Sequence, residues 1–300
     1  MGIVNISSEN SSFRGVLFSL GAFLIWGLAP IYWKQISYIS STELLGHRIL
    51  WGFLCLGLLL LIKRGKSLLD ELKLIGDRYL ILSSFLIFSN WYLFVWAVNN
   101  NHILDASLGY YLTPLINIIT GYIFFNERMG KLKILAIALA ALGVGLLFFS
   151  NSGSPIISLF LAGTFSLYGY LKKKSKLSAQ SALLFEMFVW TVPVFIYFMF
   201  LGLKGELSFF NVSPSVSFYI FFAGIITVAP LWLFNNAVRH LDLGTVGFLQ
   251  YIAPSLQLIV GVLVYNESWS KERLLTFILI WFGILLYSVD SYRKKRVNET

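Results

Sequence analysis

Long apolar runs separated by short polar connections recur along the whole chain. Stretches such as 134–149 are apolar on every side, which favours membrane-embedded helices over barrel strands, where apolar and polar residues alternate. A spanning helix needs roughly 20 apolar residues. The runs predict ten spans, at residues 14–33, 41–62, 79–99, 102–125, 132–150, 155–171, 178–201, 216–238, 242–264 and 273–290. No connection is long enough to hold a catalytic domain.

Composition supports the same fold class, an all-α polytopic membrane protein with ten transmembrane helices. Hydrophobic residues make up 57% of the chain and charged residues 12%, whereas a soluble domain carries about 25% charge. The single cysteine, Cys55, excludes an intramolecular disulfide. The net charge of +9 could suggest a nucleic-acid partner. We expect no such partner, because the distribution of the basic residues explains this charge.

Basic residues of membrane proteins collect in cytoplasmic loops. If the N-terminus is cytoplasmic, 18 of the 23 Lys and Arg residues fall on the cytoplasmic side and four on the other, with Arg48 inside a span. The sequence therefore predicts a multi-pass membrane protein with both termini in the cytoplasm.

The two halves of the chain resemble each other when shifted by 140 residues. Pro114 then meets Pro254, and Gly121 meets Gly261. We therefore predict two domains, 1–150 and 151–300, of five spans each. Because five is odd, the second domain is inverted relative to the first. Inverted repeats are typical of secondary transporters, in which one site faces each side of the membrane in turn.

Several motifs resemble those of a known transporter family. WGLAP at 26–30 and YLTP at 111–114, followed by NER at 126–128, resemble the EamA repeat of the drug/metabolite transporter (DMT) superfamily. Further segments resemble its RarD subfamily of permeases: ELLGHR at 43–48, NWYLFVWAVN at 90–99, ASLGYY at 106–111 and GFLQYIAP at 247–254.

The resemblance implies an inverted five-plus-five fold in the bacterial inner membrane. It also implies a central cavity lined by the first, third and fourth helices of each half. Related proteins export amino acids and other small metabolites, and RarD proteins are described as chloramphenicol-sensitive permeases. One departure is Tyr168, which stands where the first repeat has Trp26, so the halves need not contribute equally to a site.

Charged side chains inside spans are costly, so each is a candidate for function. Glu43 and His47 are four residues apart and share a helix face. They could carry a proton, since histidine titrates near pH 6.5, or they could hold helices together. Arg48 points about 100° away and needs another partner or a substrate carboxylate. Glu186 falls opposite His47 in the inverted half, and it could titrate or pair with a basic neighbour.

Polar and aromatic residues at membrane depth predict the lining of a cavity for a small amphipathic molecule. Interfacial belts and contacts between helices are the alternative for these residues. The candidates are Trp26, Asn90, Trp91, Tyr92, Trp96, Tyr110, Tyr111, Asn117, Tyr168, Asn235, Asn236, Gln250, Tyr251 and Gln257. Pro114 and Pro254 predict matched helix kinks that could serve gating.

Other classes of function lack their motifs. The sequence has no P-loop and no HExxH motif, and its three histidines are widely separated. We expect no metal, no cofactor and no enzymatic activity. The sequence thus favours a proton-coupled exporter of amino acids or amino-acid-like compounds, as a monomer or weak homodimer in the lipid bilayer. An importer or facilitator without proton coupling is the alternative, and an intramembrane enzyme or a sensor is the alternative from another class.

Overall fold

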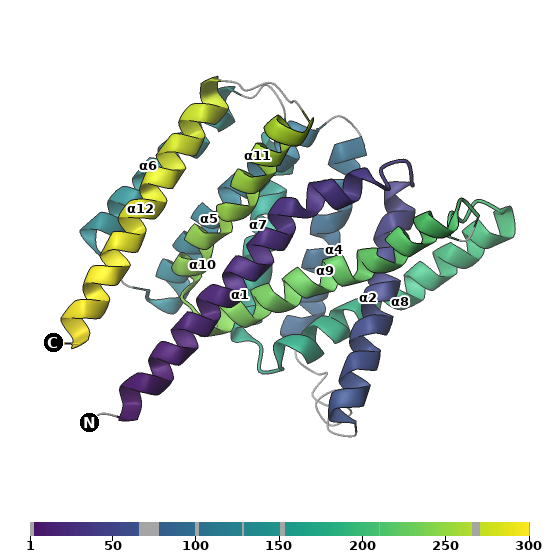
Figure 1. Cartoon of the computed structure of the whole chain (residues 1–300), viewed down its shortest axis with the longest axis horizontal. Helices are drawn as coiled ribbons and strands as arrows, with labels where there is room; N and C mark the ends of the chain where they lie inside the picture. The colour runs from purple at the N-terminus through teal and green to yellow at the C-terminus, as the bar shows by residue number, and fades with distance from the viewer. Residues whose placement is uncertain are drawn as a thin grey trace.

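The computed structural model describes residues 3–65, 78–99, 102–127, 129–150, 154–209, 211–265 and 271–299. Within these ranges the chain is helical and has no strand (Figure 1). The helices are α1 (Ile3–Lys34), α2 (Ser41–Arg64), α4 (Arg78–Asn99), α5 (Ile103–Phe125), α6 (Lys131–Ser150), α7 (Pro155–Lys174), α8 (Ala179–Lys204), α9 (Pro214–His240), α10 (Leu243–Gln250), α11 (Ile252–Tyr265) and α12 (Lys271–Glu299). Since α10 and α11 together fill the predicted ninth span, these helices match the ten predicted spans.

The outer surface of the bundle is apolar. Among the described residues, seven helical segments are long and apolar enough to cross a membrane, and Tyr79–Phe94 and Leu274–Asp290 are shorter apolar helices. Large side chains such as those of Leu58, Phe149 and Leu203 are exposed on the outside. Apolar side chains can cover an exterior in this way where the surroundings are lipid.

The helix pairings follow the internal repeat. In the sequence repeat, α7 corresponds to α1 and α9 to α4. The pair α1–α9 therefore has the pair α7–α4 as its counterpart, and α5–α7 has α11–α1. Figure 1 shows α1 rising from the side where both chain ends lie, whereas α7 descends toward that side. We call it the termini side and the opposite one the far side. The two five-helix repeats are thus inverted.

Small residues let α6 and α12 pack closely at the edge of the molecule (Figure 1). Ala136 and Ala140 of α6 are fully buried. The Thr276 hydroxyl donates a hydrogen bond to the Gly143 carbonyl over 2.8 Å, and Gly283 lies against the backbone of Ala136. The small-residue face of α6 is therefore used within one chain.

The two matched prolines have different local structures. The ninth span is interrupted at Tyr251, between α10 and α11. Pro254 follows this break and has no N–H to donate to the carbonyl of Gln250. Helix α5, in contrast, runs through Pro114 without interruption. The repeat conserves the proline in both halves, but only the second half divides its helix there.

Helices α2 and α9 cross at a point where only glycine fits. A Cβ added to Gly224 would lie 2.5 Å from the backbone nitrogen of Gly52 and 2.6 Å from the carbonyl carbon of Trp51. Backbone atoms cannot yield as a flexible side-chain end can. The absence of a side chain at Gly224 thus sets the separation of the two helices, one from each repeat.

We predict that Gly224→Ala lowers stability by about 1–3 kcal/mol, because the added methyl group forces α2 and α9 apart. Thermal unfolding in detergent micelles measures the effect. The control is Gly163→Ala in α7, where an added Cβ meets no atom within 4 Å. Equal unfolding midpoints for the two variants would contradict this account.

Candidate binding cavity

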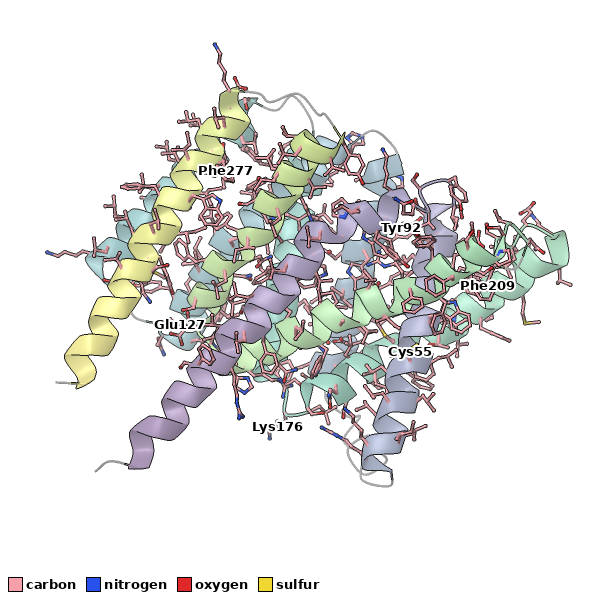
Figure 2. All side chains as sticks on the ribbon, in the orientation of Figure 1. Cys55, Tyr92, Glu127, Lys176, Phe209 and Phe277 are labelled. Atoms are coloured by element: carbon pink, nitrogen blue, oxygen red, sulfur yellow. The ribbon has the colours of Figure 1, made fainter. Side chains whose placement is uncertain are left out.

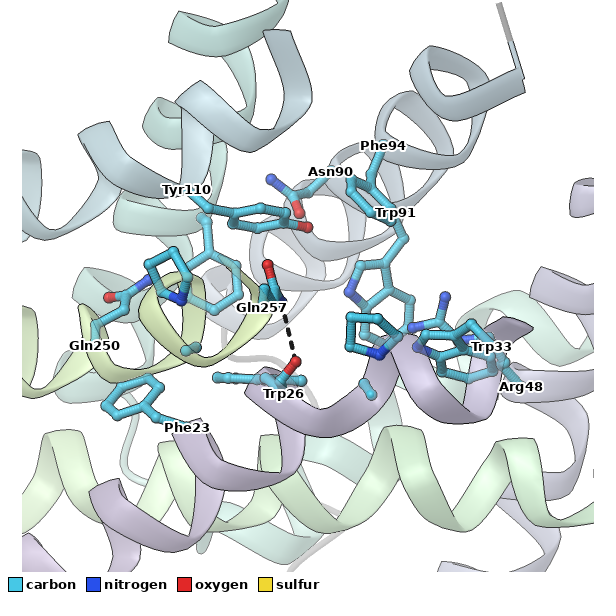
Figure 3. A pocket seen from close by; sticks show the side chains of 15 residues that line it. Phe23, Trp26, Trp33, Arg48, Asn90, Trp91, Phe94, Tyr110, Gln250 and Gln257 are labelled. Atoms are coloured by element: carbon cyan, nitrogen blue, oxygen red, sulfur yellow. Dashed lines mark hydrogen bonds between the residues drawn. The ribbon is translucent and has the colours of Figure 1, made fainter. Parts of the chain in front are cut away.

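A cavity of about 180 Å³ lies between the two repeats (Figure 3). Side chains of α1, α2, α4, α5, α7, α10 and α11 surround it, so both halves contribute. The lining consists of Phe23, Trp26, Ala29, Pro30, Trp33, Arg48, Asn90, Trp91, Phe94, Tyr110, Phe165, Gln250, Ala253, Pro254 and Gln257.

The apolar wall of the cavity comes largely from one face of α1. Phe23, Trp26, Pro30 and Trp33 are spaced by three or four residues, which places them one above the other on a helix. The ring of Trp26 meets that of Phe165 edge to face, with centroids 5.8 Å apart. Of this face the sequence prediction named only Trp26, although the spacing alone would have identified the others.

Arg48 supplies the positive charge of the cavity. Its Nε donates a hydrogen bond to the Thr227 hydroxyl over 2.9 Å. Its guanidinium lies over the rings of Trp33 and Trp91, 4.9 and 5.0 Å from their centroids. The hydrogen bond and the stacking on two indole rings together hold the guanidinium in one orientation. Among the lining residues, Arg48 is the one with a charged side chain. Its terminal amino groups offer a fork that suits a carboxylate.

Three amide side chains form the polar part of the lining. The Asn90 amide donates to the Leu161 carbonyl over 2.8 Å and to the Thr164 hydroxyl over 2.9 Å. Gln257 donates to the Trp26 carbonyl over 3.0 Å. Gln250 accepts a hydrogen bond from Asn117 over 2.8 Å. Each bond joins one repeat to the other, so the orientation of each amide is fixed by the assembly of the halves.

The structure thus brings six of the predicted cavity residues to one cavity, and Arg48 with them. The six are Trp26, Asn90, Trp91, Tyr110, Gln250 and Gln257. Tyr92 and Trp96 lie elsewhere, with 49% and 41% of their surface exposed. Figure 2 shows Tyr92 toward the far side. They follow Trp91 on α4 but face in other directions.

The other predicted residues lie outside the cavity, and all of them except the half-buried Asn236 are buried. Tyr111 and Tyr251 belong to an apolar cluster with residues of α6 and α12, and Asn117 lies behind Gln250. Asn236 donates to the Trp232 carbonyl of its own helix over 2.8 Å. Tyr168 and Asn235 lie in a polar cluster described below.

Glu43 and His47 lie outside the cavity, against the second repeat. The Glu43 carboxylate accepts hydrogen bonds from the Ser208 amide over 2.6 Å and from the Ser208 hydroxyl over 2.9 Å. The Nε2 of His47 is 3.6 Å from Glu43 Oε1, and the imidazole ring packs 4.3 Å from the ring of Phe198. Both side chains are buried. The ring nitrogens of His47 have no hydrogen-bond partner among the described residues.

Glu186 is the centre of the buried polar cluster. Its carboxylate forms an ion pair with Lys172 and accepts a hydrogen bond from the Ser83 hydroxyl. The Tyr168 hydroxyl lies 3.3 Å from Glu186 Oε2 and 3.1 Å from the amide of Asn235. Ser83 is on α4, Lys172 on α7, Glu186 on α8 and Asn235 on α9. The cluster therefore joins four helices.

A second carboxylate joins helices on the termini side, where Figure 2 shows Glu127. Asn126 ends α5 in the left-handed conformation, which asparagine tolerates, and so turns the chain. Glu127 then accepts hydrogen bonds from the amides of Leu243 and Gly244, over 2.7 and 2.9 Å, at the start of α10. Lys173 pairs with the same carboxylate over 3.0 Å. A helix N-terminus favours such a negative group. The repeat counterpart Glu267 lies outside the described residues.

Comparisons with known proteins agree with this architecture. The model of the EamA-like transporter family matches residues 13–149 and 154–289, one match for each repeat. Protein RarD of Escherichia coli strain K12 is 38% identical over 290 residues, covering 95% of this chain and 98% of that protein. An uncharacterized transporter of Vibrio cholerae serotype O1 is 37% identical over 282 residues, covering 93% of each.

More distant likenesses extend the comparison. The chloramphenicol-sensitive protein RarD of Pseudomonas aeruginosa is 28% identical over 289 residues, covering 94% of this chain and 96% of that protein. A solved structure titled "Crystal structure of protein" superposes with a TM-score of 0.71 at 16% identity. It covers 93% of this chain and 98% of its own, and it shows a shared fold.

We predict that Lys172→Met destabilises the protein by about 3–5 kcal/mol, because it leaves the buried charge of Glu186 without its partner. The double variant Lys172→Met/Glu186→Gln removes that charge and should recover most of the loss. Unfolding midpoints of the two single variants and the double variant provide a thermodynamic cycle. Additive effects would show that the two side chains do not act as a pair.

Proposed function

The chain belongs to the EamA-like transporter family, within the RarD subfamily, and from that premise we propose that it exports amino acids or amino-acid-like compounds across the bacterial inner membrane. Membership makes it a membrane transporter of small molecules. In our proposal it is a secondary transporter that works by alternating access and is coupled to protons. Its direction, substrate and coupling go beyond the family assignment.

One observation carries the proposal: among the described residues that line the cavity between the repeats, Arg48 is the one with a charged side chain. A guanidinium enclosed among aromatic rings is best stabilised by a bound anion with matching geometry. The carboxylate of an amino acid has the required charge and two oxygens. The rings of Trp26 and Phe165 then suit an apolar side chain.

The size of the cavity favours a metabolite over a drug. Sites for drug-sized ligands measure about 300–1,000 Å³, whereas this cavity is about 180 Å³. One relative carries chloramphenicol sensitivity in its name. For this chain we place a compound of amino-acid size first.

Alternating access is supported by the inverted repeats and by the closure of one side. Below the cavity, Phe165 packs against Tyr168 and Phe234, with ring centroids 6.0 and 5.2 Å apart. The polar cluster around Glu186 and the contacts of Glu127 with the start of α10 lie toward the termini side. In our proposal the termini side is cytoplasmic, as the basic loops predict. Domains 1–150 and 151–300 exchange conformations, so that the cavity opens alternately to the cytoplasm and to the opposite side of the membrane.

Glu43 and His47 are our proposed proton site. Taking up a proton would make His47 a cation beside the Glu43 carboxylate, and its ring nitrogens have no hydrogen-bond partner among the described residues. The next residue, Arg48, lines the cavity, so movement of α2 would affect both groups. Glu186 is the second candidate, and its pairing with Lys172 favours a structural role for it.

An importer or facilitator without proton coupling would use the same cavity, and flux with and without a pH gradient distinguishes it from the proposed exporter. An intramembrane enzyme would change its compound chemically, and a sensor would move none. Chemical analysis of the compound after transport distinguishes a transporter from an enzyme, and net flux distinguishes a transporter from a sensor. We propose a monomer, since the small-residue face of α6 is covered by α12.

We predict that Arg48→Gln lowers kcat/KM for amino-acid flux in proteoliposomes by about 10- to 100-fold, the effect of losing a charged hydrogen-bond partner. Arg48→Lys should recover only part of the rate, because lysine cannot form the two-pronged contact. Exposed Lys204 on α8 is the control, as Lys204→Gln removes the same charge from outside the cavity. Unchanged flux in Arg48→Gln would refute the assigned role.

We predict that Glu43→Gln abolishes accumulation driven by a pH gradient but leaves exchange of labelled substrate at equal pH. Glutamine keeps an acceptor for Ser208, so the fold survives while the carboxylate is lost. His47→Gln should behave in the same way. The matched control is Glu206→Gln, which changes an exposed carboxylate two residues after the end of α8. Full gradient-driven accumulation in Glu43→Gln would rule out this proton site.

A further inference from the structure

The cavity contains a buried acceptor that the fold leaves without a partner. Both hydrogen bonds of the Asn90 amide nitrogen go to α7, to the Leu161 carbonyl and the Thr164 hydroxyl. A carbonyl can only accept, so the amide cannot be turned around. The oxygen Oδ1 is therefore fixed, buried and without a hydrogen-bond partner among the described residues. Figure 3 shows it directed into the cavity.

Two neighbouring groups have a similar arrangement. The Gln257 amide nitrogen donates to the Trp26 carbonyl, which turns the amide oxygen of Gln257 toward the cavity (Figure 3). The Tyr110 hydroxyl also points into the cavity in this view. Asn90, Tyr110 and Gln257 come from α4, α5 and α11. Three separate helices thus direct oxygen atoms at one space.

Arg48 has the opposite character. A guanidinium donates hydrogen bonds and accepts none. Its Nε is held by Thr227, and the flanking indole rings fix its plane. Arg48, Tyr110 and Asn90 all line the same cavity. A single small molecule can therefore meet the donors of Arg48 and the acceptors around Asn90 together.

We propose that this cavity recognises a zwitterion, with the carboxylate at Arg48 and the ammonium group at Asn90 Oδ1. Gln257 and Tyr110 offer flanking acceptors to the remaining ammonium protons. The inference rests on the proposed function in one respect, that Arg48 binds a carboxylate. It adds Asn90 as the residue that selects an α-amino acid over a simple carboxylic acid.

Partial ligands fit this arrangement poorly. A carboxylate without an amino group leaves the buried oxygen of Asn90 unsatisfied, which is unfavourable. An amine without a carboxylate adds a positive charge near Arg48 with nothing to offset it. A doubly charged phosphate ester would need a second cation, and among the residues lining the cavity Arg48 is the one charged group.

The first experiment uses the unaltered protein and two sets of matched ligands. One set is phenylalanine, 3-phenylpropionate and phenethylamine; the other is leucine, 4-methylpentanoate and 3-methylbutylamine. Binding is followed by tryptophan fluorescence, since Trp26, Trp33 and Trp91 line the cavity. In at least one set the amino acid should bind about 10-fold or more tightly than either partial ligand, the effect of one charged hydrogen bond.

The second experiment tests Asn90 itself. Asn90→Leu should weaken amino-acid binding about 10-fold without weakening binding of the matched carboxylate, so that selectivity is lost. The control is Asn211→Leu, where the amide bonds to a backbone carbonyl at an exposed position. Because Asn90→Leu also removes two bonds to α7, Gln257→Leu provides a second variant with the same expected direction and a smaller effect.

Binding and flux together separate the inference from the proposed function. Amino-acid selectivity that disappears in Asn90→Leu supports the inference, even if proteoliposomes show no export. Equal binding of carboxylate and amino acid overturns it, even if both are exported and both depend on Arg48. Failure of all six ligands to bind also overturns it.

Discussion

The absence of water within a bilayer constrains this structure, because polar groups inside a span must find their partners in the protein. Lys172 is paired with Glu186, and Glu43 accepts two bonds from Ser208. Several buried polar atoms have no hydrogen-bond partner among the described residues, and Asn90 Oδ1 is the one of them that belongs to a residue lining the cavity. The ring nitrogens of His47 are two others, and they lie on the same helix as Arg48. An unpaired acceptor beside a cavity is a group that a bound molecule can satisfy.

The two repeats share a plan but use it differently. Trp26 lines the cavity, whereas its counterpart Tyr168 is buried beside Glu186. Glu186 corresponds in sequence to His47, yet it has a lysine partner that His47 lacks. The second repeat thus neutralises Glu186 with its own Lys172, and Arg48 remains as the charge facing the cavity. An asymmetric cavity can fix the orientation of a small molecule with two different ends, which a symmetric one cannot.

The sequence was sufficient for the fold because spans, repeats and inversion depend on apolar length and on the odd number of helices. The cavity was predicted only in part, since it depends on the direction of each side chain. Trp91 lines the cavity and Tyr92 does not, although one helix step of about 100° separates them. Residue type favoured both equally. The hydrogen bonds of Glu127 could not be predicted either, because its partners are the backbone amides of residues 243 and 244, far along the chain.

The two ion pairs toward the termini side, Lys172–Glu186 and Lys173–Glu127, differ in the free energy needed to separate them. Lys172 and Glu186 are shut off from solvent, so separating them leaves two charges in an apolar interior with no water to replace the partner. The pair of Lys173 and Glu127 retains 18% and 10% exposure, and water can take over part of its bonds. A transition that opens this side is therefore easier if α4, α7, α8 and α9 stay together around Glu186. In the proposed alternating access, the contacts of Glu127 are then the ones that break, because the side chains of Glu127 and Lys173 are partly exposed and can be hydrated.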